Sequence, residues 1–311
     1  MILKDKSRAI IALVTSALLF GSTFAVVKDL ISDLTPVNIV FLRYLLAAIL
    51  FLITGGIPEK EYLKPGLLMG VFLWIGYITQ TIGLETTSTI NSGVVTGFYI
   101  VLTPIFSKYI NKNVIQKKNL IGSIAGFAGI LLIALNDLDQ LFGNLFTLIC
   151  ATGYALHIVM VEKYVKDLNI SKLMFVQSAV GSILCIPFIN YENLNISYKF
   201  FVPIFFLGFV VNFCAFYLQL FGQKFINAST ASLLFGLEGV FALLIGVFFV
   251  GEVLNLLNIP LKKGEEACKK AGINIKLNEI HRVVYRKPYD LIITDWIKAF
   301  IQKNNKCHDL I

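Results

Sequence analysis

Charged residues are scarce in this chain. Only 15% of its 311 side chains are Asp, Glu, Lys or Arg, whereas soluble domains carry about 25%. The five cysteines form no CxxC pair and no Cys/His spacing typical of a metal site, so neither a zinc fold nor a dithiol centre is indicated. HExxH, paired catalytic aspartates and a Walker nucleotide loop are also missing, which argues against a membrane enzyme and against an ATP-driven machine.

Long apolar runs take the place of charge. Apolar side chains make up 57% of the sequence and gather in blocks close to the roughly 17–25 residues that a bilayer-spanning helix needs. Because lipid offers the backbone no hydrogen bonds, each block is expected to be a helix. The sequence therefore predicts an all-α polytopic membrane protein with nine spans: Ala9–Val27, Val37–Thr54, Pro65–Leu84, Ile90–Phe106, Leu120–Leu135, Phe142–Val161, Leu173–Ile189, Phe200–Phe221 and Ala231–Val250.

Positive charge in the short loops predicts how the chain is threaded, because Lys and Arg favour the cytoplasmic side. If the N-terminus is cytoplasmic, the segments on that side hold 13 Lys and Arg, and the opposite side holds only Lys28 and Lys199. We therefore expect a multi-pass protein of the cell inner (plasma) membrane with a cytoplasmic N-terminus.

Two offsets in the sequence indicate an internal repeat. Moving 134 residues along the chain takes Phe41–Arg43 to Phe175–Gln177, and moving 139 residues takes Gly97–Val101 to Gly236–Val240. Each copy would hold five spans, and an odd number of spans places the second copy in the opposite orientation. Inverted repeats of this kind are a recurring transporter design, with the binding site near the bilayer midplane.

The second copy is expected to be incomplete. We predict a first repeat over residues 1–135, a second repeat over 142–257 and a polar tail over 258–311. The fifth span of the first repeat corresponds by offset to Asn258–Asn274, and that stretch holds four lysines and two glutamates. Such a segment cannot span a bilayer, so the second repeat lacks its fifth helix.

The basic tail leaves two interpretations open. After nine spans it would lie outside the cell, although it carries 11 Lys and Arg. One interpretation is a genuine extracytoplasmic tail, in which Cys268 and Cys307 are able to pair. The other is a chain whose end was altered by a frameshift or a gene fusion, which would make the protein a truncated transporter with impaired function.

Four stretches of sequence carry a resemblance to a known family. They are "LLFGSTFAVVK" at Leu18–Lys28, "FLRYLLAAIL" at Phe41–Leu50, "SGVVTGFYIVLTP" at Ser92–Pro104 and "LLFGLEGVFALLIGVFFVGE" at Leu233–Glu252. In order and spacing they resemble the EamA family of the drug/metabolite transporter superfamily. The resemblance implies ten spans in a five-plus-five inverted repeat, a central cavity, and transport of small metabolites, often by export.

Two charged residues lie deep inside predicted spans. Glu238 is ~13 Å and Arg43 ~10 Å from the nearer end of its span at 1.5 Å per residue. A charged group at the centre of a span costs roughly 2.5–3.5 kcal/mol on insertion scales, so it normally faces a cavity or a partner. We expect both residues to bind substrate in the central cavity, as a charged pair or as separate contacts. The alternatives are a structural ion pair between the halves and an Arg43 that reaches out to the interface.

The repeat adds Tyr99 and Gln177 to the candidate substrate-binding residues. Tyr99 corresponds by offset to Glu238 and is expected to line the cavity from the other half. Gln177 corresponds to Arg43, and its alternative role is an interhelical hydrogen bond. His157 titrates near neutral pH and is a candidate proton carrier, although a lone buried histidine is more often structural.

Three further polar or aromatic side chains in spans are weaker candidates for the substrate path: Trp74, Gln80 and Asn91. Trp74 has a plain packing role as its alternative. The glycine spacings Gly66…Gly70 and Gly93…Gly97 predict close approach of helices rather than a binding loop.

The predicted function is that of a secondary transporter, an exporter or exchanger of a small polar metabolite such as an amino acid. It would work by alternating access around a midplane cavity, with a gradient or substrate exchange as its energy source. The expected partners are a small-molecule substrate and the lipid bilayer, and a homodimer is left open. No cofactor, metal or nucleic acid is expected.

Overall fold

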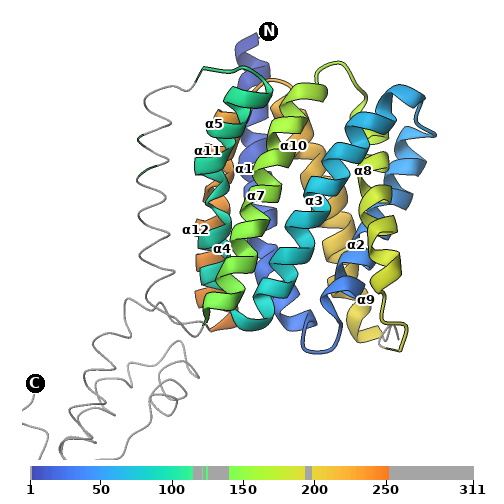
Figure 1. Cartoon of the computed structure of the whole chain (residues 1–311), viewed down its shortest axis with the longest axis vertical. Helices are drawn as coiled ribbons and strands as arrows, with labels where there is room; N and C mark the ends of the chain where they lie inside the picture. The colour runs from blue at the N-terminus through green and yellow to red at the C-terminus, as the bar shows by residue number, and fades with distance from the viewer. Residues whose placement is uncertain (1, 115–120, 122–123, 125–139, 193–197, 252–311) are drawn as a thin grey trace, which may run out of the picture. The chain divides into compact units, whose positions relative to one another are not determined.

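The computed structural model describes residues 2–114, 121, 124, 140–192 and 198–251, and its secondary structure in this part of the chain is entirely helical (Figure 1). Eight of the nine predicted spans correspond to helical stretches that are long and apolar enough to cross a membrane. The remaining predicted span, Leu120–Leu135, lies almost entirely outside the described residues, as does the tail 258–311. Four of the eight spans are single helices: α1 (Ile2–Leu30), α2 (Pro36–Gly55), α3 (Lys60–Thr86) and α7 (Leu141–Tyr164).

The other four spans consist of shorter segments in line. Their bounds are α4 (Thr89–Thr96) with α5 (Tyr99–Ile110); α8 (Ile170–Cys185) with the 3₁₀ turn η2 (Ile186–Phe188); α9 (Tyr198–Phe205) with the π-helical η3 (Phe206–Ala215) and α10 (Phe216–Gln223); and α11 (Ala228–Phe235) with α12 (Leu237–Ile245) and the π-helical η4 (Gly246–Val250).

Polar caps explain where four of the helices begin. Thr35 caps α2, Ser88 caps α4, Asn169 caps α8 and Asn227 caps α11. In each case the side-chain oxygen accepts a hydrogen bond from the backbone N–H three residues further on, which satisfies one of the donors that a helix start leaves open.

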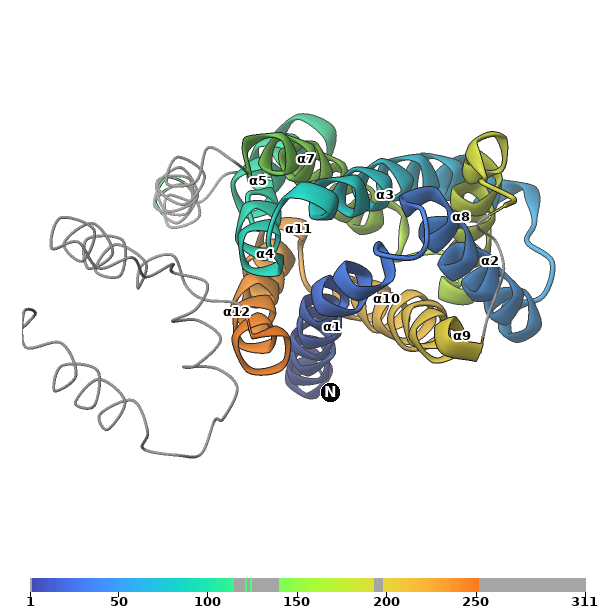
Figure 2. The ribbon, with the colours of Figure 1, turned by 90° about the horizontal axis from the view of Figure 1, so that it is seen from below.

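Viewed along their length, the spans form a bundle with two flanks and two narrow sides (Figure 2). One flank holds α3 and α7, and the other holds α1 and α10. One narrow side is made by α2 and α8, and the other by α4, α5, α11 and α12. This arrangement surrounds the middle of the bundle with helices from both halves of the sequence.

Contacts between the helices fix their directions. Gly83 lies against Gly143 and Gly76 against Gly153, so α3 and α7 run antiparallel. On the opposite flank the Ser16 hydroxyl donates to the carbonyl oxygen of Ala215 over 2.9 Å, beside the contact of α1 with α10. Helices α1, α2 and α3 follow one another and alternate in direction, so α3 runs parallel to α1 and α7 runs opposite to α1 (Figure 1).

The predicted close approach of helices at Gly66 and Gly70 is confirmed. A Cβ added to Gly66 would stand 2.5 Å from the Val176 side chain, and one added to Gly70 would stand 2.8 Å from Val180. Helices α3 and α8 therefore touch through these glycines, in the way that small residues permit in membranes.

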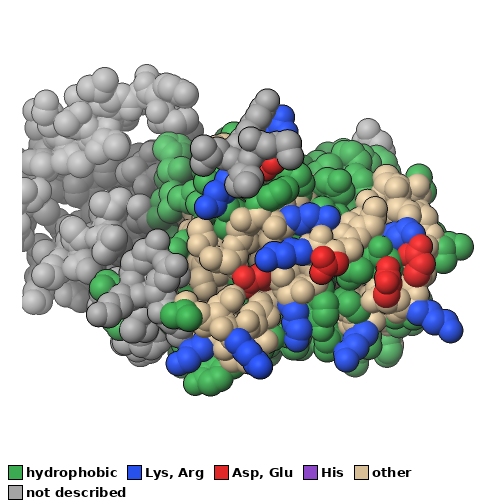
Figure 3. Space-filling model, turned by 90° about the horizontal axis from the view of Figure 1, so that it is seen from above, with side chains coloured by type: hydrophobic (Ala, Val, Ile, Leu, Met, Phe, Trp, Pro, Cys, Tyr) green, Lys and Arg blue, Asp and Glu red, His purple; other side chains and the backbone are tan. Residues whose placement is uncertain are grey.

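Apolar side chains face outward along the bundle and charged ones gather at its ends. Ile53 is 75% exposed and Phe249 is 84% exposed, as expected for surfaces that lipid covers. Figure 3 shows the end nearer the N-terminus, where Lys and Arg side chains gather among several carboxylates. The surface thus separates into an apolar belt and polar ends.

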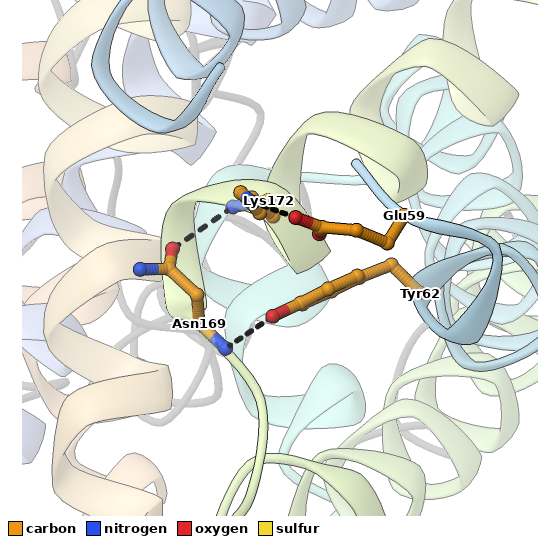
Figure 4. Close-up of polar contacts among 4 residues, drawn as sticks. All are labelled: Glu59, Tyr62, Asn169 and Lys172. Atoms are coloured by element: carbon orange, nitrogen blue, oxygen red, sulfur yellow. Dashed lines mark hydrogen bonds and ion pairs between the residues drawn. The ribbon is translucent and has the colours of Figure 1, made fainter. Parts of the chain in front are cut away.

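The polar ends carry short clasps between the helices. At the N-terminal end Lys172 on α8 forms an ion pair with Glu59, and the Tyr62 hydroxyl accepts from the backbone N–H of Asn169 over 3.3 Å (Figure 4). The hydrogen bond from Lys172 lowers the pKa of the Glu59 carboxyl below its ordinary value. At the other end Lys199 pairs with Asp33 over 2.7 Å and lowers the Asp33 pKa in the same way.

Candidate functional site

The span of α4 and α5 lies beside the span of α11 and α12, and the two meet near the middle of their length (Figure 2). Helix α4 ends at Thr96 and α5 begins at Tyr99, while α11 ends at Phe235 and α12 begins at Leu237. Tyr99 and Glu238 follow these two interruptions and are in contact. The Tyr99 hydroxyl donates to Oε2 of Glu238 over 3.1 Å. Both side chains are buried, with 1% and 5% of their surface exposed.

A narrow cavity of about 30 Å³ surrounds this contact. Polar and aromatic side chains from both halves of the sequence form its walls. The lining residues are Phe20, Thr23, Leu73, Tyr77, Gln80, Tyr99, Tyr154, His157, Ile158, Phe216, Gln219, Phe235 and Glu238.

Glu238 gives the cavity its charge. It is the only acidic side chain among the described residues that line the cavity, and no Lys or Arg lines it. A buried carboxylate is unfavourable unless it gains a proton, a cation or enough hydrogen bonds, and the Tyr99 hydroxyl is the one hydrogen-bond donor that Glu238 has among the described residues. The arrangement is therefore suited to bind a proton or a cationic group.

The expected positions of Gln80 and His157 agree with the structure, because both line the cavity. Gln80 accepts a hydrogen bond from the Tyr154 hydroxyl and donates one to Thr96, each over 3.2 Å. His157 Nε2 lies 3.0 Å from Oε1 of Gln177. These amide contacts hold polar side chains in fixed orientations around the acid.

Gln177 has the interhelical role that was its alternative. It is fully buried, bonds to His157 on α7, and is absent from the cavity lining. This contact fixes the orientation of the lining side chain His157.

The anticipated ion pair of Arg43 with Glu238 does not form among the described residues. Arg43 is fully buried, and its Nε donates to Oδ1 of Asn212 over 3.0 Å. Its guanidinium carbon lies 3.8 Å from the centre of the Tyr77 ring. Arg43 thus lies directly behind a cavity-lining side chain and does not itself line the cavity.

Trp74 and Asn91 lie away from the cavity lining. The Trp74 indole donates to Sγ of Cys185 over 3.2 Å, which is the packing role. Asn91 donates to Oε1 of Gln140 over 2.8 Å, in a polar cluster at the start of α4. Both residues depart from the expected substrate path because they face other helices.

Sequence reasoning missed half of the polar lining. Thr23, Tyr77, Tyr154 and Gln219 line the cavity and were not among the candidates. The offsets 134 and 139 contained the signal, since they take Thr23 to His157 and Gln80 to Gln219.

Among the described residues no three His, Cys, Asp or Glu side chains come together in a way that would hold a metal ion. What the geometry defines is a class: a multi-pass helical membrane protein with a buried polar cavity between its helices.

The sequence profile of the EamA-like transporter family matches the chain twice, over residues 7–135 and 141–259. The chain belongs to this family. It is accordingly a membrane transporter and not an enzyme.

Relatives with curated sequences carry similarly broad names. An uncharacterized transporter of Archaeoglobus fulgidus is 31% identical over 240 residues, which cover 76% of this chain and 77% of that protein. The uncharacterized transporter YyaM of Bacillus subtilis is 27% identical over 264 residues, covering 77% of this chain and 85% of YyaM. A crystal structure of a protein 18% identical matches with a TM-score of 0.63 over 79% of this chain and 90% of that chain, which shows that the fold is shared.

Proposed function

We propose that the protein is a secondary transporter that exports or exchanges a small polar metabolite by alternating access around the central cavity. The observation that carries the proposal is the buried contact between Tyr99 and Glu238, where two spans from opposite halves of the sequence meet. In transporters built from inverted repeats the binding site lies near the midplane, between the two halves.

The two broken spans correspond residue by residue, which supports a repeat. An offset of 139 takes the cap Ser88 to the cap Asn227 and the break at Gly97 to the break at Gly236. The same offset takes Tyr99 to Glu238. Each half thus contributes the same position of the same kind of broken span to the cavity.

Helix contacts repeat with the same offsets. A Cβ at Gly83 would stand 2.8 Å from the Gly143 carbonyl oxygen, and a Cβ at Gly222 would stand 3.1 Å from that of Ala9. Gly83 and Gly222 differ by 139 residues, and Ala9 and Gly143 by 134. The contact of α3 with α7 therefore has a counterpart in the contact of α10 with α1. Because α7 runs opposite to α1, this correspondence supports an inverted repeat.

The cavity lining also falls into pairs. The offset of 134 takes Phe20 to Tyr154 and Thr23 to His157, and the offset of 139 takes Tyr77 to Phe216 and Gln80 to Gln219. A cavity on a pseudo-two-fold axis between two halves would have such a lining. Rocking of one half against the other would then open the same site to either side of the membrane.

The lining favours a substrate with a cationic group. Glu238 offers one buried negative charge, and the aromatic rings around it provide faces that attract cations. Hydrogen-bonding groups such as Gln80 and Gln219 suit further polar atoms of the substrate. A small amine-bearing metabolite, such as an amino acid, fits these properties better than a hydrocarbon does.

We place the N-terminus in the cytoplasm of a cell whose inner (plasma) membrane holds the protein. The end of the bundle rich in Lys and Arg is the end nearer the N-terminus (Figure 3), and basic residues favour the cytoplasmic side. A homodimer remains a prediction, and the size of the purified protein in detergent would test it.

Uptake into proteoliposomes with an imposed pH gradient tests the proposal. A panel of amino acids, amines and other small polar metabolites should include at least one that accumulates only when the gradient is present. Glu238→Gln should abolish that accumulation while the variant still inserts into membranes, and Glu59→Gln, on the surface, serves as the matched control. Wild-type flux in Glu238→Gln would remove the acid from the mechanism.

A further inference from the structure

Arg43 and Asn212 form a buried, hydrogen-bonded pair whose remaining donor nitrogens have no acceptor among the described residues. Arg43 is fully buried and Asn212 is 2% exposed. The Arg43 Nε donates to Asn212, but Nη1 and Nη2 of Arg43 and Nδ2 of Asn212 have no acceptor in hydrogen-bond geometry among the described residues. Buried polar groups in native proteins are nearly always hydrogen-bonded, and a buried charge is nearly always paired. The guanidinium also has the ring and the hydroxyl of Tyr77 beside it, but neither carries a charge that balances it. The buried positive charge therefore points to an anion.

The group adjoins the cavity. The guanidinium of Arg43 stacks on the ring of Tyr77, and Tyr77 lines the cavity. Asn212 precedes the lining residue Phe216 by four positions, about one helical turn, in the span that carries η3. A rotation of the Tyr77 side chain would bring an anionic group in the cavity within reach of these donors.

We propose that Arg43 and Asn212 form an anion subsite of the transport site, which binds a carboxylate of the substrate and which the Tyr77 ring separates from the main cavity. This inference rests on the proposed function, because it assigns a second substrate group to the same cavity. With Glu238 as the site for a cationic group, the substrate is a zwitterion that carries both charges.

A carboxylate matches these donors in shape. The planar guanidinium presents two parallel N–H groups that fit the two oxygens of a carboxylate, and the Asn212 amide can donate a third bond. Chloride is the competing anion, since it has charge but no fork of acceptors. The test separates the two.

Binding to the purified chain in detergent, measured by isothermal titration in chloride-free buffer, tests the subsite. The probes are the twenty standard amino acids and, for the tightest binder, the amine that lacks its carboxylate and the acid that lacks its amino group. We expect the amino acid to bind the wild type about 10- to 100-fold more tightly than the amine, the range for a lost charged hydrogen-bond pair. Equal affinity for the two, or no amino acid binding at all, would overturn the inference.

Asn212→Asp provides a variant that is expected to fold. Its carboxylate would lie beside the Arg43 guanidinium and satisfy the open donors from within the protein. The variant should unfold at a higher temperature and should bind the amino acid no better than the amine. Retained preference for the amino acid in Asn212→Asp, or in Arg43→Gln, would assign Arg43 a structural role.

The remaining outcomes separate this inference from the proposed function. Gradient-driven uptake of an amine that depends on Glu238, without preference for the carboxylate, would leave the transporter standing and refute the subsite. Chloride that competes with the amino acid only in the wild type supports an anion site, whereas chloride that binds and leaves the amino acid affinity unchanged refutes the carboxylate assignment. Absence of Glu238-dependent uptake of every probe would refute the proposed function itself.

Discussion

The first and second halves of this chain build similar frameworks with different chemistry. At the broken spans the first half supplies the neutral Tyr99 where the second half supplies the acid Glu238. On the α2 and α8 side the order is reversed, because the first half supplies the charged Arg43 and the second half the neutral Gln177. Each buried charge therefore has an uncharged counterpart, which is what an oriented polar substrate would require of a cavity between two similar halves.

The positions that hold helices together are less divided. Gly83 and Gly222 are both glycine, and each lies in close contact with a neighbouring helix. One pair of cavity positions is also shared, since Gln80 and Gln219 are both glutamine. The two halves therefore differ most at the two positions that carry a buried charge. Four experiments probe this difference between the halves, and they follow in decreasing order of the effect that we expect.

Gly83→Ala and Gly222→Ala compare the two glycine contacts. A Cβ at Gly83 would stand 2.8 Å from a backbone oxygen, which cannot move easily, whereas the closest atoms to a Cβ at Gly222 belong to the flexible Leu13 side chain. We expect Gly83→Ala to destabilise the protein by about 2 kcal/mol and Gly222→Ala by about 1 kcal/mol. Thermal unfolding in detergent measures both, and a larger loss at Gly222 would contradict the packing described.

Tyr99→Phe removes the one hydrogen-bond donor that Glu238 has among the described residues, and leaves the ring in place. A hydrogen bond to a charged group contributes about 1.5–3 kcal/mol, so substrate affinity should fall at least tenfold, as ~1.4 kcal/mol corresponds to tenfold. Titration of the substrate identified by uptake measures the loss. Tyr109→Phe, an exposed residue at the end of α5, is the control, and equal affinities in the two variants would count against the contact.

Ser88→Ala and Asn227→Ala remove the corresponding helix caps of α4 and α11. Each side chain accepts one backbone hydrogen bond, over 3.0 Å and 2.8 Å respectively. A lost cap costs about 1 kcal/mol, so the two variants should lose similar stability. A cost confined to one variant, read from unfolding in detergent, would show that the two caps are not equivalent.

Mild acid should weaken the end clasps. The folded-state pKa of Glu59 and of Asp33 is lowered by hydrogen bonds from Lys172 and Lys199, so each carboxylate contributes stability above its ordinary pKa of 4.5 or 3.8. That contribution is lost as the pH falls through the lowered folded-state pKa. Since both pairs are exposed, the effect is the smallest of the four. Unfolding of wild type and Glu59→Gln at pH 3 and pH 7 should differ less at pH 3.

Hydropathy predicted the spans well because the cost of burying polar backbone and charge in lipid is large. The predicted Val37–Thr54 corresponds to α2 at Pro36–Gly55, and the predicted Phe142–Val161 corresponds to α7 at Leu141–Tyr164. Hydropathy could not predict the irregular turns at Gly97 and at Gly236, because such turns change the backbone conformation without changing how apolar the segment is. The predicted span Ile90–Phe106 corresponds to the helical stretch Thr89–Ile110, which is irregular at Gly97 and Phe98.

The site was predicted in part. Glu238, Tyr99, Gln80 and His157 line the cavity, since a polar side chain deep in a span must face inward. A polar side chain that faces inward can line the cavity or can pack against a neighbouring helix, and hydropathy does not distinguish the two. That choice depends on how each helix is rotated in the bundle, and Trp74 accordingly contacts Cys185 instead.

Access to the paired glutamines from the two sides of the membrane provides the sharpest test of alternating access. Gln80 and Gln219 line one cavity from opposite halves. Each would be changed to Cys in a background where Ser replaces the five native cysteines, and then treated with a membrane-impermeant thiol reagent from the inside or the outside. Alternating access predicts that both positions react from either side and that bound substrate protects both. Labelling of the two positions from one fixed side, unaffected by substrate, would contradict a shared cavity that opens to each side in turn.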